Sequence, residues 1–217
     1  MPSHKADEIH KKKGGRSATE RDEFLRVLRA AWRVMVAGVV DPRRVVFVDE
    51  CGTHTSLAPT YGYSPKGERL RLRLPRNRGK NTTLLASISL EGMGPSMAVE
   101  GSTTTEVFEA YLEQVLLPEL EEGQVVLMDR VPAHKPNRVR YLIEERGLEL
   151  IYLPSYSPDY NPIEEAFSKI KEILRRACAR TREALVEALG EALSAVSLKD
   201  ARGFFEHAGY HAIGQPL

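Results

Sequence analysis

The sequence predicts an α/β fold, in which a mixed five-stranded sheet carries helices on both of its faces. Two short runs, VVFV at 45–48 and VVLM at 125–128, are apolar throughout and rich in β-branched residues. Strands that are buried on both faces have this composition. Segments with helical spacing of apolar residues alternate with these runs, which is the order of elements that builds parallel strands joined by right-handed crossovers.

Each element follows from a local pattern. Apolar residues at near-helical spacing predict a first helix over 18–38. TTLLASISL at 82–90 and PSMAVEG at 95–101 predict a hairpin across EGMG, which we expect to join the first strand antiparallel. The remaining predicted elements are a helix over 104–117 that Pro118 ends, the strand 125–128, a helix over 136–146 that Gly147 ends, a strand over 148–153, a long helix from 162 to about 178, and short helices over 183–196 and 199–208.

Length and composition are those of one soluble domain. The chain has 217 residues, of which 42% are hydrophobic and 28% are charged. It holds no apolar run near the roughly 18 residues of a membrane span and no secretory signal. The two cysteines, Cys51 and Cys178, form no metal-ligand spacing. We therefore expect a cytoplasmic protein with no membrane partner, made of a flexible tail over 1–16 and one domain over 17–217.

The charges are unevenly distributed although the net charge is only +1. One basic run comprises Lys66, Arg69, Arg71, Arg73, Arg76, Arg78 and Lys80, and a second comprises Lys169, Lys171, Arg175, Arg176, Arg180 and Arg182. Two such runs in a near-neutral chain favour a polyanionic partner. The alternative is a solvated sheet edge that alternating arginines protect from pairing.

Acidic residues follow two of the predicted buried strands. Asp49 and Glu50 come after VVFV, and Asp129 comes after VVLM. Ligands of open α/β sheets bind beyond the carboxyl ends of the strands. Neighbouring carboxylates repel each other and usually need a proton or a cation, and Mg²⁺ prefers oxygen ligands. A single Asp at such a place is more often a turn or helix cap, but the pair indicates a metal site.

The stretch SPDYNPIEEAFSKIK offers a third carboxylate. Asn161 is a good N-cap, Pro162 suits the first helical position, and Glu164 falls where a capping box needs an acid. Glu164 also borders the apolar stripe of this helix and can reach over the end of the sheet, whereas Glu165 is expected to turn towards solvent. Local rules therefore leave open whether Glu164 caps the helix or serves an active site.

Five segments carry a resemblance to a known family: VVFVDECG, YGYSPKGERLRL, VLMDRVPAHK, GLELIYLPSYSPDYNPIEEAFSKIK and the closing AGYH. They resemble the catalytic domain of the DDE transposases of bacterial insertion sequences, in the mariner superfamily. The 34 residues between Asp129 and Glu164 are the separation typical of this branch.

The resemblance implies a ribonuclease-H-like fold and a metal-dependent activity. Asp49, Asp129 and Glu164 would be the catalytic acids and would hold two Mg²⁺ or Mn²⁺ ions. The reaction would be phosphodiester cleavage at a transposon end, followed by strand transfer to target DNA. The implied partners are DNA and either a second copy of the chain or a separate DNA-recognition chain. We expect DNA contacts from Lys66, Arg69, Arg71, Arg76, Arg78, Lys80, His134, Lys135, Lys169 and Lys171, although His134 can equally cap the next helix.

Two departures from the family pattern support an alternative. Arg130 follows the second aspartate, where the family commonly has Asn. The family's N-terminal helix-turn-helix modules are also missing from this sequence. The chain could be the second frame of a split element, a domain that relies on another chain, or a truncated remnant that keeps the fold, binds DNA and does not cleave it. A stand-alone ribonuclease-H-like nuclease is a weaker third reading.

Overall fold

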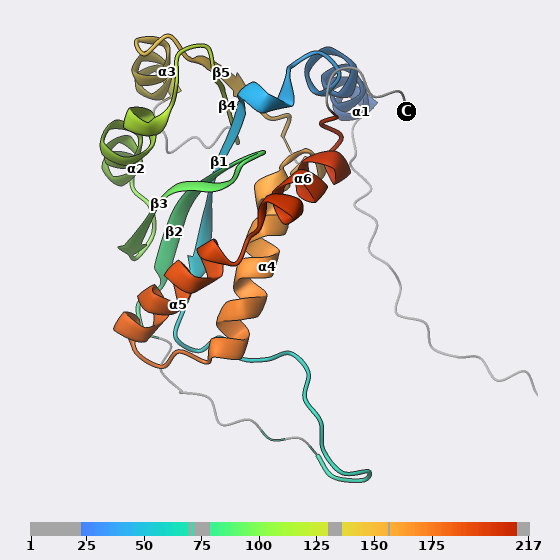
Figure 1. Ribbon diagram of the computed structural model, residues 1–217, viewed down its shortest axis with the longest axis vertical. Coiled ribbons are helices and arrows are strands. Elements are labelled where there is room, and N and C mark those ends of the chain that lie inside the picture. Colours follow the sequence, from blue (N-terminus) through green and yellow to red (C-terminus); the bar gives the residue numbers. More distant parts are fainter. Residues whose placement is uncertain (1–22, 70, 72–78, 130–135, 156, 212–217) are drawn as a thin grey trace, which may run out of the picture.

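The computed structural model describes residues 23–69, 71, 79–129, 136–155 and 157–211. Five strands form one sheet in the order β3-β2-β1-β4-β5 (Figure 1). The parallel strands β4 and β5 lie on one side of β1, and the antiparallel hairpin of β2 and β3 lies on the other. Their bounds are Val45–Thr53 for β1, Thr82–Ser89 for β2, Gly92–Glu100 for β3, Val125–Met128 for β4 and Glu149–Tyr152 for β5. The predicted mixed five-stranded sheet is confirmed, while the tail predicted over 1–16 lies outside the described residues.

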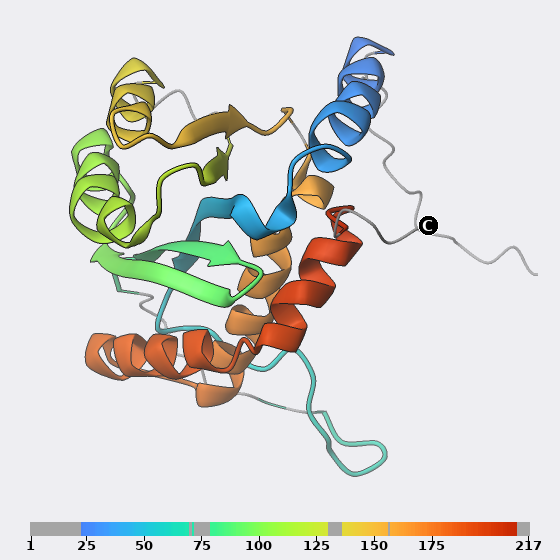
Figure 2. The same cartoon turned by 45° about the horizontal axis from the view of Figure 1, so that its top comes forward.

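Six α-helices surround the sheet within the described ranges (Figures 1 and 2). They are α1 Glu23–Trp32, α2 Thr105–Tyr111, α3 Pro136–Glu144, α4 Pro162–Ala177, α5 Arg182–Ser194 and α6 Leu198–His207. The helix predicted over 104–117 is not a regular α-helix up to Pro118. A π-helical turn over Leu112–Leu116 follows α2, and Pro118 lies within a 3₁₀ turn over Leu117–Glu119. In the described part of the chain, no helix has both the length and the apolar character needed to cross a membrane.

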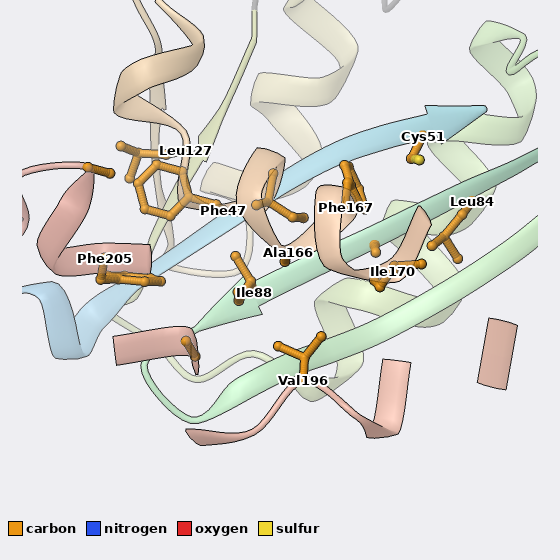
Figure 3. Packing of buried hydrophobic residues seen from close by; sticks show 14 of the residues in the cluster. Phe47, Cys51, Leu84, Ile88, Leu127, Ala166, Phe167, Ile170, Val196 and Phe205 are labelled. Atoms are coloured by element: carbon orange, nitrogen blue, oxygen red, sulfur yellow. The ribbon is translucent and has the colours of Figure 1, made fainter. Parts of the chain in front are cut away.

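The helices cover both faces of the sheet, as predicted. Along β1, Val45 and Phe47 belong to a core with α4, α5 and α6, whereas Val46 and Val48 belong to a second core with α2 and α3. Figure 3 shows Phe167 of α4 packed over the sheet in the first core. The stripe predicted for α4 is confirmed, since its members Ile163, Phe167, Ile170 and Leu174 are all buried. Each such side chain contributes roughly 1.5–3 kcal/mol on burial, so the stripe fixes which face of α4 meets the sheet.

Strand β1 is longer than VVFV. Its parallel pairing with β4 ends at Val48 and Met128, but its antiparallel pairing with β2 continues to Thr53. Asp49 and Glu50 therefore lie inside the strand rather than after it. The polar residues stay extended because β2 still satisfies their backbone groups on one side.

The hairpin turn lies earlier than EGMG. Ser89 pairs with Gly92, so Leu90 and Glu91 form the turn and β3 starts at Gly92, whose φ of 112° favours glycine. Gly94 lies within β3, where a Cβ would come within 2.5 Å of Ser87 Oγ, so the position favours glycine. The two glycines that suggested a loop thus belong to the strand.

Candidate active site

Sheet pairing places two aspartates next to each other. Val48 of β1 and Met128 of β4 are the last paired residues of these neighbouring parallel strands. Asp49 and Asp129 are the next residues on each strand. Their charges interact, since the Asp129 carboxylate is among the groups that raise the pKa of Asp49. The structure therefore brings together the two acids that the sequence located after the strand runs.

The Asp49 carboxylate is oriented by two hydrogen bonds. Its Oδ1 accepts the backbone N–H of Glu50 at 2.7 Å, and its Oδ2 accepts the side-chain amide N–H of Asn161 at 2.9 Å. Burial nevertheless raises the pKa of Asp49 to about 7, with further contributions from the carboxylates of Glu164, Asp129 and Glu50. Asp129 is more exposed, and partial desolvation raises its pKa as well. These shifts mark a place where negative charge is concentrated away from water.

Glu164 lies in the first turn of α4, with its side chain exposed and its charge felt at Asp49. Of the two roles that the sequence left open for Glu164, the structure does not form the capping box. Asn161 occupies the N-cap position, but its side chain makes no capping hydrogen bond and reaches Asp49 instead. A backbone bond from Glu164 N–H to the Asn161 carbonyl at 3.1 Å closes the first turn. The Glu164 carboxylate is therefore not part of a capping box.

The turn before α4 is held from two sides. The Tyr210 hydroxyl donates to the Tyr160 carbonyl at 2.9 Å, and Tyr210 packs edge-on against Phe47 of β1. On the other side, the Tyr160 hydroxyl donates to the Arg29 carbonyl of α1 at 3.3 Å, while the Arg29 guanidinium pairs with Asp159 and lies over the Tyr160 ring. The C-terminal segment and α1 thus fix the point from which Asn161 and Glu164 are presented.

The acids provide the right donor chemistry for a hard cation, but they do not form a closed ligand cage. In the described ranges, no three His, Cys, Asp or Glu side chains lie close enough together to hold a metal ion. Carboxylate oxygens are nevertheless the donors that Mg²⁺ selects, and Mg²⁺ often uses only one or two of them. The Asn161 Oδ1 is also buried with no partner among the described residues. The residues therefore fit a divalent cation, with Asp49 at the centre of the donor set.

Glu165 and Lys171 show how the rest of α4 is used. Glu165 keeps 40% of its side chain exposed, in line with the expected turn towards solvent, and it pairs with the exposed His207 at the end of α6. This pairing raises the pKa of His207. Lys171 lies beside Cys51, where its ammonium counters the rise in pKa that burial causes in that thiol. Since Cys51 also feels the charges of Asp49 and Glu164, Lys171 is a cation close to the acids.

The predicted DNA contacts fall into three groups. Lys66, Arg69 and Arg71 are exposed on the long segment between β1 and β2. Lys80 and Lys169 take part in internal ion pairs, with Glu100 and Asp200 respectively, and Lys169 also donates to the Ala195 carbonyl at 2.9 Å. Arg76, Arg78, His134 and Lys135 lie outside the described residues, as does Arg130.

A hollow of about 450 Å³ opens between the segment after β1 and the second half of α4. Arg175 and Arg176 line it from the helix, and Tyr61 lines it from the segment with 90% of its side chain exposed. Figures 1 and 2 show this segment extending from the sheet past the C-terminal end of α4. The sequence predicted the basic charge of this region, but the hollow and the exposed tyrosine required the structure.

The fold and the strand-end acids do not assign a function by themselves, but comparison with known families identifies the family. The family described as DDE superfamily endonuclease matches residues 44–186, which is more than half of the chain and includes all three acids. The chain belongs to this family. It is also 28% identical over 104 residues to the transposable element Tcb1 transposase of Caenorhabditis briggsae, covering 46% of this chain and 38% of that relative.

Solved structures of the Mos1 transposase share the fold. The pre-cleavage Mos1 transpososome superposes with a TM-score of 0.71 at 17% identity, over 94% of this chain and 64% of that one. The paired-end complex with the left transposon end gives 0.72 at 20% identity, over 93% and 65%. The catalytic domain of Mos1 mariner transposase gives 0.61 at 16% identity, over 93% and 92%. The chain thus spans less than two thirds of the Mos1 chain in the first two of these complexes, and the ribonuclease-H-like fold is confirmed.

Proposed function

We propose that the chain is a catalytic domain of a DNA transposase, which cleaves phosphodiester bonds and transfers DNA strands at Asp49, Asp129 and Glu164. The observation that carries this proposal is that the Asp49 carboxylate lies within reach of the charges of both Asp129 and Glu164, which help to raise its pKa. The three acids come from β1, from the residue after β4 and from α4, and all of them lie in the segment that matches the endonuclease family.

The three carboxylates would hold two divalent cations, Mg²⁺ or Mn²⁺, which supply activation of the attacking oxygen and stabilisation of the leaving one. Mos1 paired-end complexes solved with Mg and with Mn support this choice of metal. The chain's own residues keep the carboxylates in place: the Glu50 backbone and the Asn161 amide orient Asp49, and the anchored turn at Tyr160 presents Glu164.

The DNA would run from the acids along α4 to the hollow. Glu164, Lys171 and Arg175 are spaced by seven and then four residues, so they share one side of the helix. The span from Glu164 to Arg175 is about 16 Å at the rise of an α-helix. Arginine and lysine side chains bind phosphates regardless of sequence, and an exposed tyrosine can stack on a base. The exposed Lys66, Arg69 and Arg71 extend the same positively charged surface.

DNA cleavage tests the proposal. A supercoiled plasmid carrying the inverted repeats that flank the gene is incubated with the protein and Mg²⁺ or Mn²⁺, beside Asp129→Asn. Metal-dependent nicking at the repeat ends by the natural protein, and none by Asp129→Asn, is expected. Equal products from the two proteins would contradict the assignment of the acids.

Salt-dependent binding tests the DNA path. The double variant Arg175→Ala and Arg176→Ala should bind duplex DNA more weakly, and its affinity should depend less steeply on salt, by about one unit of slope for each lost phosphate contact. Arg176→Ala alone is compared with Arg140→Ala as its matched control, because Arg140 and Arg176 each pair with a glutamate four residues away and Arg140 belongs to α3. An equal loss in both proteins would argue against a path along α4.

A second candidate function is a remnant that keeps the fold and binds DNA without cleaving it. It is favoured by the open arrangement of the acids, since no three metal-binding side chains of the described residues group together. Arg130 beside Asp129 favours it too. DNA binding without metal-dependent cleavage would identify this case.

The comparisons point to relatives of the Tcb1 and Mos1 transposases rather than to the bacterial insertion sequences that the resemblance named. We infer that the protein works as a homodimer or with a separate DNA-recognition chain. The Mos1 complexes named above contain transposon ends, which supports DNA as the partner. An overlapping upstream frame encoding helix-turn-helix modules in the flanking DNA would support the split-element form, and its absence would count against it.

A further inference from the structure

Asn161 has the position of a helix cap but makes another contact. Its side chain leaves the N–H groups of α4 without a capping bond. Its amide N–H instead donates to Asp49 Oδ2 across 112 residues of sequence. Only 3% of Asn161 is exposed, so this hydrogen bond is shielded from competing water. Asn161 therefore makes no capping hydrogen bond to its own helix and instead binds an acid that is distant in sequence, so the contact with Asp49 determines its side-chain orientation.

The other end of the same amide is unsatisfied. Asn161 Oδ1 is buried and has no hydrogen-bond partner among the described residues. An unpaired buried acceptor destabilises a protein, so such atoms often mark a place where a ligand or ion completes the structure. The oxygen belongs to the group that holds Asp49, next to the charges of Asp129 and Glu164. Amide oxygens are suitable ligands for hard cations, directly or through water.

Helix α4 does not need the Asn161 side chain to begin. Pro162 occupies the first helical position and is buried, and the Asn161 carbonyl accepts the backbone N–H of Glu164. Ile163 and Phe167 bury the inward face of the first turns. Proline at this position preorganises the helix start, so the amide is available for another role.

We propose that Asn161 is a positioning residue of the cation site: its N–H orients the Asp49 carboxylate, and its Oδ1 adds a neutral oxygen to the donors that receive a divalent cation. This inference rests on the proposed function for the identity of the site, but not on the cleavage reaction. Residues that orient a metal ligand through a hydrogen bond typically change metal affinity by about 10–100-fold.

Asn161→Ser separates the two roles. Serine caps helices about as well as asparagine but is too short to keep the contact with Asp49. Mn²⁺ alone is titrated into the natural protein, Asn161→Ser, Asn161→Ala and Ser197→Ala, with the unfolding temperature of each metal-free protein measured in parallel. We expect Asn161→Ser and Asn161→Ala to bind Mn²⁺ at least about tenfold more weakly. Asn161→Ser should keep its unfolding temperature, and Ser197→Ala, a cap far from the acids, should keep its Mn²⁺ affinity.

Three outcomes would overturn the inference: Mn²⁺ affinity of Asn161→Ser within twofold of the natural protein, no Mn²⁺ binding by the natural protein, or failure of both Asn161 variants to fold. The last would show that the side chain supports the fold instead of the site. DNA cleavage is assayed on the same samples. A natural protein that binds Mn²⁺ without cleaving DNA would refute the proposed function and leave the inference on Asn161 intact.

Discussion

Helices α4 and α6 begin with the same kind of sequence, a capping residue followed three positions later by an acid. At α6, Ser197 and Asp200 form a complete capping box, and Lys169 pairs with the same carboxylate. At α4, the side chains of Asn161 and Glu164 do not form a capping box, and the Asn161 amide donates a hydrogen bond to Asp49 instead. The same local pattern thus caps α6, whereas at α4 the side chain of the capping residue binds an acid of the site. The helices differ because the Asp49 carboxylate of β1 lies within hydrogen-bond reach of Asn161 at the start of α4.

The largest expected effect concerns the acids near α4. Asp129→Asn should lose DNA cleavage by more than the roughly 10–100-fold typical of residues that only support a metal ligand, because it removes a ligand itself. Its unfolding temperature should not fall, since the change removes a charge from a site where carboxylates repel each other. Cleavage rates and thermal unfolding measure the two effects. A large loss of stability would mean that Asp129 supports the fold, as Asp200 does.

Asp49, near the start of α4, and Asp200, in the first turn of α6, should make the free energy of unfolding depend on pH with opposite signs. The pKa of Asp49 is raised from 3.8 to about 7 by burial and neighbouring carboxylates, so in the metal-free protein its stabilising contribution is present at low pH and is lost as pH rises through this window. Each unit of difference corresponds to about 1.4 kcal/mol, so the loss should reach a few kcal/mol by neutral pH. The difference in unfolding free energy between the natural protein and Asp49→Asn measures it.

Asp200 provides the contrast. Hydrogen bonds from Lys169 and Ser197 hold the pKa of Asp200 well below its usual value. Its contribution to stability is therefore present above the ordinary aspartate pKa and is lost as pH falls below it. Comparison with Asp200→Asn should show the opposite slope from Asp49→Asn. If the contributions of Asp49 and Asp200 to the free energy of unfolding changed with pH in the same direction, the proposed difference between α4 and α6 would be wrong.

The smallest expected effect comes from the cap of α6. Ser197→Ala removes the side chain that accepts the Asp200 N–H and should lower the unfolding free energy by about 1 kcal/mol. DNA cleavage should stay at the natural level, because Ser197 is not part of the acid cluster. Chemical denaturation and the plasmid assay check the two expectations. Reduced cleavage at full stability would show that α6 contributes to the site.

The sheet could be predicted because its pattern is local and repeated. Apolar runs such as VVFV and VVLM, and the stripe of α4, report burial directly in the sequence. The end of β1 could not be predicted, since Asp49 and Glu50 remain extended only through their pairing with β2. The role of Asn161 was hidden for a related reason. Its capping preference is a local rule, and the acid that overrides it lies more than a hundred positions away.

Some site assignments remain predictions. The 34-residue separation and the strand runs were enough to select Asp49, Asp129 and Glu164, and the structure adds their electrostatic interaction. Charge alone did not show which cations pair with acids of the chain itself. Lys169 supports α6 and Lys80 pairs with Glu100, whereas Lys171 faces Cys51 near the acids. The spacing along α4 could have indicated that Lys171 lies near the acids. Lys171 is two helical turns beyond Glu164 and so lies on the same side of the helix, whereas Lys169 does not.

Diffraction from crystals grown with Mn²⁺ tests the central claim most directly, since the anomalous signal locates the metal among the side chains. We expect two Mn²⁺ ions about 3.5–4 Å apart, in contact with the carboxylates of Asp49, Asp129 and Glu164. Mn²⁺ bound elsewhere, or a Glu164 carboxylate more than about 10 Å from that of Asp129 and hence too far to share a metal pair, would contradict it.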